Sequence, residues 1–155
     1  MKAVIATVAA AAALAAAGSA AAQDWRLPAN YGAVTLYSGF TPDPYNINVV
    51  AGGSIDASSS VSSSCRGWIS GAPDFELTYQ AGSLPLIISV NSNADTTLVI
   101  NGPDGRWYCD DDGGQNLNPS LRWGSPSTGT YDIWVGSYNG QPAQAVLSIS
   151  ELYTY

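Results

Sequence analysis

Hydrophobic and polar residues alternate over short stretches of this chain, which is the periodicity of β-strands that bury one face. The clearest stretch is 75–80, where Phe75, Leu77 and Tyr79 fall on one face. Glycine and proline recur throughout, whereas lysine, glutamate and methionine, which build surface helices, are scarce. Further strands are predicted at 33–37, 45–50, 66–69, 86–90, 97–100, 106–109, 131–135 and 145–149. We therefore predict an all-β protein with almost no helix: an antiparallel β-sandwich, jelly-roll-like, of eight or nine strands.

One hairpin can be assigned a register. Two of the predicted strands flank the sequence Gly-Pro-Asp-Gly at 102–105, a strong turn signal. A turn centred on its Pro-Asp pair places Leu98 opposite Cys109 and Asp95 opposite Asp112. This register brings Asp95 to the end of the hairpin where a run of three further aspartates follows.

The first 22 residues have the features of a secretory signal peptide. Lys2 supplies a positive charge, an apolar run rich in alanine follows, and small residues precede Gln23. We predict a signal peptide at 1–22, an N-terminal linker at 23–32 and a single β-sandwich domain at 33–155. The leader predicts a secreted or periplasmic protein, and no second apolar span predicts a transmembrane segment in the mature chain.

The mature chain would be strongly acidic. Without Lys2 it keeps four arginines and no lysine against twelve acidic residues, a net charge of −8. Nucleic acids and anionic lipids require clustered cations, so cations are the more plausible charged partners. Histidine is absent, which removes the usual catalytic triads and imidazole zinc sites. A hydrolase with paired carboxylates needs two acids across a cleft, and no cleft can be recognised in the sequence.

The two cysteines predict a disulfide. Cys65 and Cys109 lie 44 residues apart, and exported proteins fold in an oxidising compartment. Two free thiols or half of a metal site are the alternatives, but the cysteine or histidine partners of such a site are missing. The serine-rich stretch 58–64, just before Cys65, is predicted to be a loop or an edge strand.

An acidic, glycine-containing loop is the candidate metal site. Calcium takes six to eight oxygen ligands, which a loop rich in Asp, Asn and Gly supplies from close spacing. The alternative is an exposed acidic turn, in which the same residues satisfy backbone geometry. The predicted ligands are Asp95, Asp110, Asp111, Asp112 and Asn118.

Tryptophan and tyrosine are abundant, with five and nine residues. Amphipathic aromatic rings suit the faces of sugars, although such residues more often fill a core or its rim. Strand parity puts Trp134 on the opposite face from Ile133 and Val135. We identify Trp107, Trp123 and Trp134 as candidate ligand-facing aromatics.

From Asp74 onward four features occur in a fixed order: a strand with an Ala-Gly turn at 75–82, the block 95–105, the acidic run 110–112 and the Gly-Thr-Tyr strand at 129–138. With these features the chain resembles the bacterial pre-peptidase C-terminal domain family. Family members are β-sandwiches, usually appended to secreted proteases and not catalytic themselves, and some bind calcium or extracellular polymers. Residues 24–73 are too short for a protease domain, so we expect a stand-alone domain.

Together these features predict a non-catalytic binding or interaction module that is secreted or periplasmic and binds calcium. A carbohydrate- or polymer-binding module of the cell envelope or matrix is the first alternative, and a small hydrolase is the second. The expected partners are cations and either a glycan or an extracellular or envelope protein. Calcium is the one cofactor expected.

Overall fold

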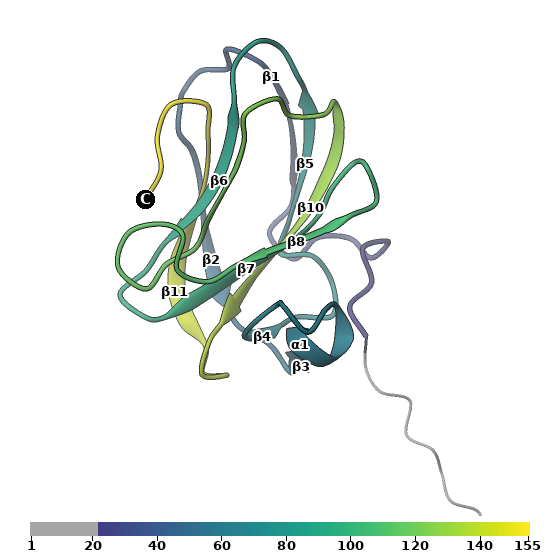
Figure 1. Ribbon diagram of the computed structural model, residues 1–155, viewed down its shortest axis with the longest axis vertical. Coiled ribbons are helices and arrows are strands. Elements are labelled where there is room, and N and C mark those ends of the chain that lie inside the picture. The colour runs from purple at the N-terminus through teal and green to yellow at the C-terminus, as the bar shows by residue number, and fades with distance from the viewer. Residues whose placement is uncertain (1–21) are drawn as a thin grey trace, which may run out of the picture.

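The computed structural model describes residues 22–155, and residues 1–21 of the predicted signal peptide lie outside the described residues. The described chain is a two-layered β-sandwich, which confirms the predicted fold class (Figure 1). It has eleven strands instead of eight or nine, because the two-residue β3 and the strand β9 were not predicted. The elements are β1 (Ala33–Tyr37), β2 (Tyr45–Ala51), β3 (Ile55–Asp56), α1 (Ala57–Ser60), β4 (Trp68–Ile69), β5 (Phe75–Gln80), β6 (Leu86–Asn91), β7 (Thr96–Asn101), β8 (Trp107–Asp110), β9 (Ser120–Trp123), β10 (Gly129–Ser137) and β11 (Ala143–Ser150).

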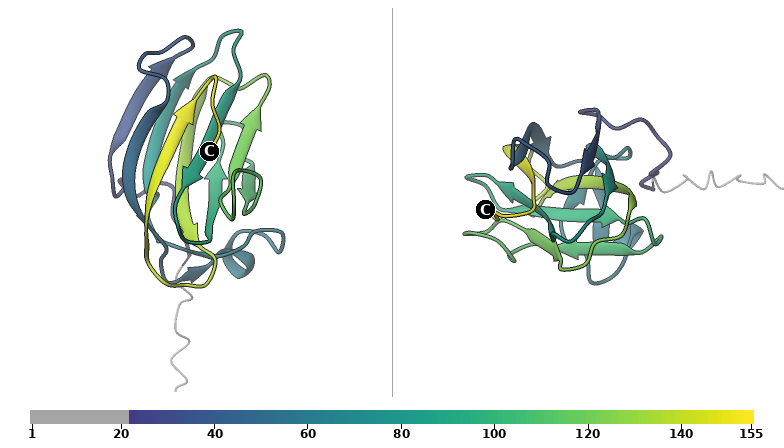
Figure 2. Two further views of the ribbon diagram at one scale, coloured as in Figure 1. Left: turned by 90° about the vertical axis from the view of Figure 1, so that its left-hand side faces the viewer. Right: turned by 90° about the horizontal axis from the view of Figure 1, so that it is seen from above.

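The two sheets are each centred on one of the last two strands, and Figure 2 shows the layers from two further directions. Sheet A runs β1-β5-β10-β7-β8, and β4 and β3 continue it beside the end of β10. Sheet B runs β2-β11-β6-β9. Within residues 22–155, β1 and β5 are the one parallel pair, so the predicted antiparallel arrangement holds for every pair but this one.

The main core fills the space between the sheets. Alternate residues of each strand point inward, as the sequence pattern predicted, and Leu77, Ile88, Ile133 and Leu147 are fully buried there. Burying one such aliphatic side chain contributes about 1.5–3 kcal/mol to folding. The outward-facing side chains of each strand do not take part in this core, so they can be polar.

The β7–β8 hairpin is shifted by one residue from the predicted register. Leu98 pairs with Asp110, and Val99 pairs with Cys109. The loop has five residues because Gly105 adopts a φ of 73°, the left-handed conformation that adds a bulge after a tight turn. The shift places Cys109 on the outer face of sheet A instead of the inner one.

A small cap covers the lower half of that outer face. We define the cap as residues 54–69, which contain β3, α1 and β4 (Figure 1). Its side chains Ile55 and Ile69 form a second apolar cluster with Val99 and Trp134 of sheet A. The cap includes the serine-rich stretch 58–64, whose first three residues belong to the helix α1 and not to the predicted loop or edge strand.

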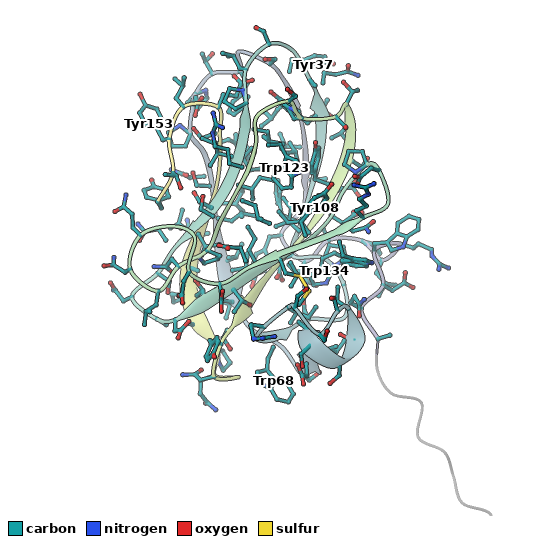
Figure 3. The ribbon with its side chains drawn as sticks, viewed as in Figure 1. Tyr37, Trp68, Tyr108, Trp123, Trp134 and Tyr153 are labelled. Carbon is teal, nitrogen blue, oxygen red and sulfur yellow. A yellow bond between two sulfur atoms is a disulfide. The ribbon has the colours of Figure 1, made fainter. Side chains whose placement is uncertain are left out.

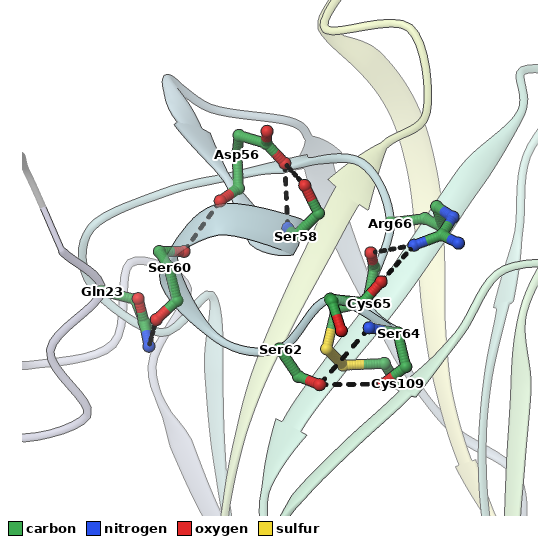
Figure 4. Close-up of a disulfide and its surroundings, with 10 residues drawn as sticks. Gln23, Asp56, Ser58, Ser60, Ser62, Ser64, Cys65, Arg66 and Cys109 are labelled. Carbon is green, nitrogen blue, oxygen red and sulfur yellow. Dashed lines mark hydrogen bonds between the residues drawn. A yellow bond between two sulfur atoms is a disulfide. The ribbon is translucent and has the colours of Figure 1, made fainter.

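One interaction attaches the cap to sheet A and another stabilises the cap internally, and Figure 4 shows both. The disulfide between Cys65 and Cys109 joins the cap to β8, as predicted. Asp56 caps α1 by accepting a hydrogen bond from the backbone N–H of Ser58 at 2.9 Å.

No helix within residues 22–155 is long and apolar enough to cross a bilayer.

The predicted linker at 23–32 packs along the domain. The backbone N–H of Asp24 donates to the carbonyl of Gly71 at 2.7 Å, and that of Tyr31 donates to the carbonyl of Asp74 at 2.8 Å. These bonds hold the N-terminal segment against the outer face of sheet A, next to β5.

Candidate functional site

Two of the predicted calcium ligands stabilise the loop between β8 and β9. The Asp110 carboxylate accepts hydrogen bonds from the backbone N–H groups of Gly113 and Ser120, both at 2.8 Å. Asn118 is buried, and its side-chain oxygen accepts from the Thr96 hydroxyl at 2.6 Å. These polar atoms already have protein partners, which accounts for the residue types without a metal.

The other three predicted ligands come closer to the expected arrangement. One carboxylate oxygen of Asp95 is buried and has no hydrogen-bond partner among residues 22–155. Burial, followed by the negative charges of Asp112 and Asp111, raises the pKa of the Asp95 carboxyl. The described residues contain no group of three or more acidic or cysteine side chains placed to hold a metal ion. Calcium binding therefore stays a prediction.

The three candidate tryptophans do not form one exposed surface, because Trp107 and Trp134 lie in the cluster under the cap and Trp123 packs against the main core. Figure 3 labels Trp123 and Trp134. Trp134 points to the outer face, as its parity predicted, but it is fully buried under the cap, so the prediction that it faces a ligand is wrong. Trp107 packs on it with ring centroids 5.4 Å apart. Trp123 belongs to the main core and meets Tyr108 edge-on at 5.3 Å.

A polar row crosses sheet A directly beside the cluster under the cap. Asp132 of β10 pairs with Glu76 of β5 on one side and with Asn101 of β7 on the other. Opposed residues of an antiparallel pair project from the same face. The three side chains therefore lie next to one another on the outer face, while the adjacent Leu77 and Ile133 point into the core.

This row forms the floor of a groove, which we call the carboxylate groove. One wall comes from the N-terminal segment that was predicted to be a linker. The hollow has a volume of about 490 Å³ and is lined by Trp25, Arg26, Leu27, Pro28, Glu76, Thr130 and Asp132. A second hollow of about 400 Å³ shares Trp25, Thr130 and Asp132 and extends to the β7–β8 turn. The two hollows share these three residues and therefore lie side by side, with one reaching to β5 and the other to the β7–β8 turn.

Asp132 is the least solvated acid in the groove. Its residue surface is 5% exposed, and no group of residues 22–155 donates a hydrogen bond to its carboxylate, whose oxygens keep contact with solvent in the groove. Burial first, and the charge of Glu76 second, raise the pKa of Asp132 to about 6. A largely desolvated carboxylate without a donor from the protein has acceptor capacity left for a ligand.

Asp74 shows what a structural buried aspartate looks like in the same protein. It is also nearly inaccessible, and burial raises its pKa to about 6. Its carboxylate, however, accepts hydrogen bonds from the backbone N–H of Val135 at 2.8 Å and from the Asn30 side chain at 3.1 Å. Asp74 thereby ties the N-terminal segment to β10, a role that Asp132 lacks.

Arg26 is the one basic residue that lines the groove. Its guanidinium carbon lies 5.4 Å from the centroid of the Trp25 ring, and its Nε lies 3.6 Å from the Asp24 carboxylate. Neither Glu76 nor Asp132 forms a salt bridge within residues 22–155. The floor of the groove therefore keeps its negative charge.

The sequence analysis did not identify this groove. A signal was present, because Glu76 and Asp132 interrupt two strands otherwise rich in apolar and β-branched residues, and aspartate is depleted in strands. That these two strands are neighbours, and that the N-terminal segment borders them, depends on contacts between distant parts of the chain. The pattern of a single strand does not contain that information.

Comparisons with known proteins give likenesses of fold. No family model matches the chain, and no curated protein matches it either. Among solved structures, the chain is similar to the pre-peptidase C-terminal domain of collagenase from Bacillus anthracis, with 12% sequence identity and a TM-score of 0.44, over 76% of this chain and 94% of that one. It is also similar to PliG of Aeromonas hydrophila, a periplasmic inhibitor of g-type lysozyme, with 12% identity and a TM-score of 0.41, over 76% and 96%. The first of these structures belongs to the family that the sequence resembles, and at this identity the likeness assigns neither a family nor a site.

Proposed function

We propose that this protein is a non-catalytic binding module that acts outside the cytoplasm and binds its partner in the carboxylate groove. The observation that carries the proposal is Asp132, a residue only 5% exposed whose carboxylate lines the groove and accepts no hydrogen bond from residues 22–155. Ligand sites are typically concave, several hundred Å³ in volume and lined by apolar groups around a few polar ones. The groove has that size and composition.

The compartment is supported by the covalent chemistry of the chain. The disulfide joins Cys65 and Cys109, which lie 44 residues apart in the sequence. Disulfides of this structural kind persist in oxidising compartments and are rare in the cytosol. Secretion or delivery to the periplasm therefore fits the disulfide and the predicted leader.

A hydrolase is the alternative that the same acid pair favours. Aspartic proteases activate water with two side-by-side carboxyls that share a proton, and one of the two has a raised pKa. Glu76 and Asp132 are side by side, but no hydrogen bond connects their carboxyls among those of residues 22–155. Because proton sharing is what makes such a dyad catalytic, the geometry supports binding over hydrolysis. Hydrolysis of general peptide and glycoside substrates at pH 4–6 that disappears in Asp132→Asn would reverse this choice.

A glycan-binding function has a different surface in its favour. A hollow of about 250 Å³ on the outer face of sheet B is lined by Asn48, Asn91, Asn93 and Gln144, among others. None of these four side-chain amides has a hydrogen-bond partner in the described chain. Unpaired amides can donate to and accept from sugar hydroxyls.

We also propose that calcium binds where Asp95 faces Asp111 and Asp112. Burial first, and then the negative charges of Asp112 and Asp111, raise the pKa of Asp95, and a bound cation would offset both effects. A cation that binds only the folded state would raise the free energy of unfolding by about 2.7 kcal/mol at one hundred times its Kd. Thermal unfolding with calcium and with chelator tests this, and Asp111→Asn with Asp112→Asn should remove the response. An unchanged melting temperature would leave the loop as a solvated turn.

Chemical-shift mapping tests which surface binds. The 15N-labelled protein is titrated with basic and acidic peptides, neutral oligosaccharides and calcium chloride. We expect ligand-dependent shifts at Trp25, Asn101 and Thr130, and we expect Asp132→Asn to reduce them. Shifts confined to Asn48, Asn91 and their neighbours would support the glycan alternative and contradict the groove.

A further inference from the structure

We infer that the carboxylate groove recognises an arginine side chain presented by a basic partner protein. This inference rests on the proposed function and specifies the chemical group that the groove accepts. It starts from Asp132, a residue that is 95% buried, whose carboxylate has no hydrogen-bond donor among residues 22–155 and lines both hollows of the groove.

The charge balance of the groove selects a cation. Glu76 and Asp132 are directly opposed on neighbouring strands, an arrangement of like charges that destabilises a sheet. The described chain offers them no salt bridge, because the two ion pairs it forms join Arg26 to Asp24 and Arg106 to Asp104. A positive charge from outside the chain relieves this repulsion, which a neutral sugar cannot do.

The walls of the groove select a cation on an apolar stem. Trp25, Leu27 and Pro28 line the same hollow as the carboxylates, so apolar surface and negative charge lie within one site. Arginine and lysine bury their methylene stems along apolar surface while the charged head stays with polar groups. Calcium, by contrast, needs six to eight oxygen ligands and gains nothing from an apolar wall.

Two features favour a guanidinium over an ammonium. Two carboxylates side by side present several acceptor oxygens to the planar fork of arginine, which binds carboxylates through paired hydrogen bonds. The ring of Trp25 already carries one guanidinium, that of Arg26, at 5.4 Å from its centroid. Guanidinium groups stack on tryptophan more often than ammonium groups do.

The shape and charge of the whole molecule favour a protein as the source of the arginine. The two hollows share Trp25, Thr130 and Asp132, so the second hollow leaves room for neighbouring residues of a partner. With twelve acidic residues and five basic ones, the chain attracts basic proteins over long range.

Peptide titrations monitored by 15N chemical shifts test the inference. The probes are Ac-Gly-Gly-Arg-Gly-Gly-NH2, the same peptide with lysine or the neutral isostere citrulline at its centre, free spermidine and calcium chloride. We expect the arginine peptide to shift Trp25, Asn101 and Thr130 and to bind at least tenfold more tightly than the citrulline peptide. Glu76→Gln and Asp132→Asn should each weaken it at least fivefold. Asp56→Asn, which removes the same charge from the cap and keeps an N-capping residue, should change its Kd less than twofold.

The alternative outcomes separate the inference from the proposed function. Equal binding of the arginine and citrulline peptides in the groove overturns the inference and leaves the groove as a binding site. Equal binding of the lysine peptide overturns the choice of arginine. Equal binding of spermidine overturns the choice of a protein as the source of the cation. No saturation at millimolar arginine peptide, with oligosaccharide shifts in the groove, also overturns the inference alone. Shifts outside the groove for every probe overturn both.

Discussion

The outer face of sheet A has two halves built on the same strands, and one half is covered while the other is open. Trp134 and Val99 form the lower half, where the cap and the disulfide bury them. Asp132, two residues before Trp134 on β10, belongs to the upper half, which the N-terminal segment borders without covering. The covered half completes a core. The open half holds a largely desolvated carboxylate without a protein partner, which core formation does not explain.

The largest expected effect on stability comes from removing the large buried side chain of the covered half. Trp134→Ala should lower the free energy of unfolding by about 3–5 kcal/mol, because it leaves a large cavity beneath the cap. Trp134→Phe is the matched control, since it keeps an aromatic ring and removes a buried indole N–H that has no partner in the described chain. Urea unfolding measures both. Comparable losses in the two variants would contradict the cavity explanation.

Removing the disulfide should have the next largest effect. Replacing Cys65 and Cys109 by serine should lower stability by about 2–4 kcal/mol, since the unfolded chain loses a loop constraint. The two halves should then separate in behaviour, because the cap loosens while the groove keeps its shape. Thermal unfolding gives the loss of stability, and unchanged binding of the arginine peptide verifies that the open half is independent of the cap.

The pH dependence of stability should report on the unpaired charge. Asp132 and Asp74 both have a folded pKa of about 6, above the ordinary aspartate value of 3.8. The folded state therefore binds more protons than the unfolded state between about pH 4 and 6, and the free energy of unfolding falls as pH rises through that window. Lowering the pH from 7 to 5 should raise the melting temperature.

Asparagine substitutions divide this pH effect between the two residues. Asp132→Asn should stabilise the protein at pH 7 by about 1 kcal/mol and weaken its pH dependence, because a buried charge without partners disappears. Asp74→Asn should instead destabilise it, because the carboxylate accepts hydrogen bonds from Val135 and Asn30. Melting curves at pH 5 and 7 for both variants test this contrast, and a destabilising Asp132→Asn would assign Asp132 a structural role.

The smallest expected effect on stability is at the wall of the groove. Trp25 is 49% exposed, so Trp25→Ala should change the free energy of unfolding by less than about 0.5 kcal/mol. It should still weaken the arginine peptide several-fold, since a cation–π contact at an exposed site contributes about 0.5–1 kcal/mol. Titration and unfolding of the same sample measure both values, and a loss of stability without a loss of affinity would make Trp25 a packing residue.

The sequence predicts local structure here better than it predicts contacts. The alternation at 75–80 is reproduced residue for residue in β5, because side-chain parity is a property of one strand. The β7–β8 register failed by one residue, since it depends on the conformation of Gly105. Trp134 was placed on the correct face of its strand. The burial of Trp134 was not predictable from its strand, because the cap that covers it is formed by residues 54–69, far away in the sequence.

The last hairpin of the chain also determines when folding can begin. Because β10 separates β5 from β7 and β11 separates β2 from β6, neither sheet has its middle strand until Gly129–Ser150 has been synthesised. Before that point the chain can form only isolated strand pairs such as β7–β8, which are marginally stable in water. A nascent chain that ends before Gly129 should therefore remain open to proteases. Chains that cross a membrane as extended threads benefit from such a delay.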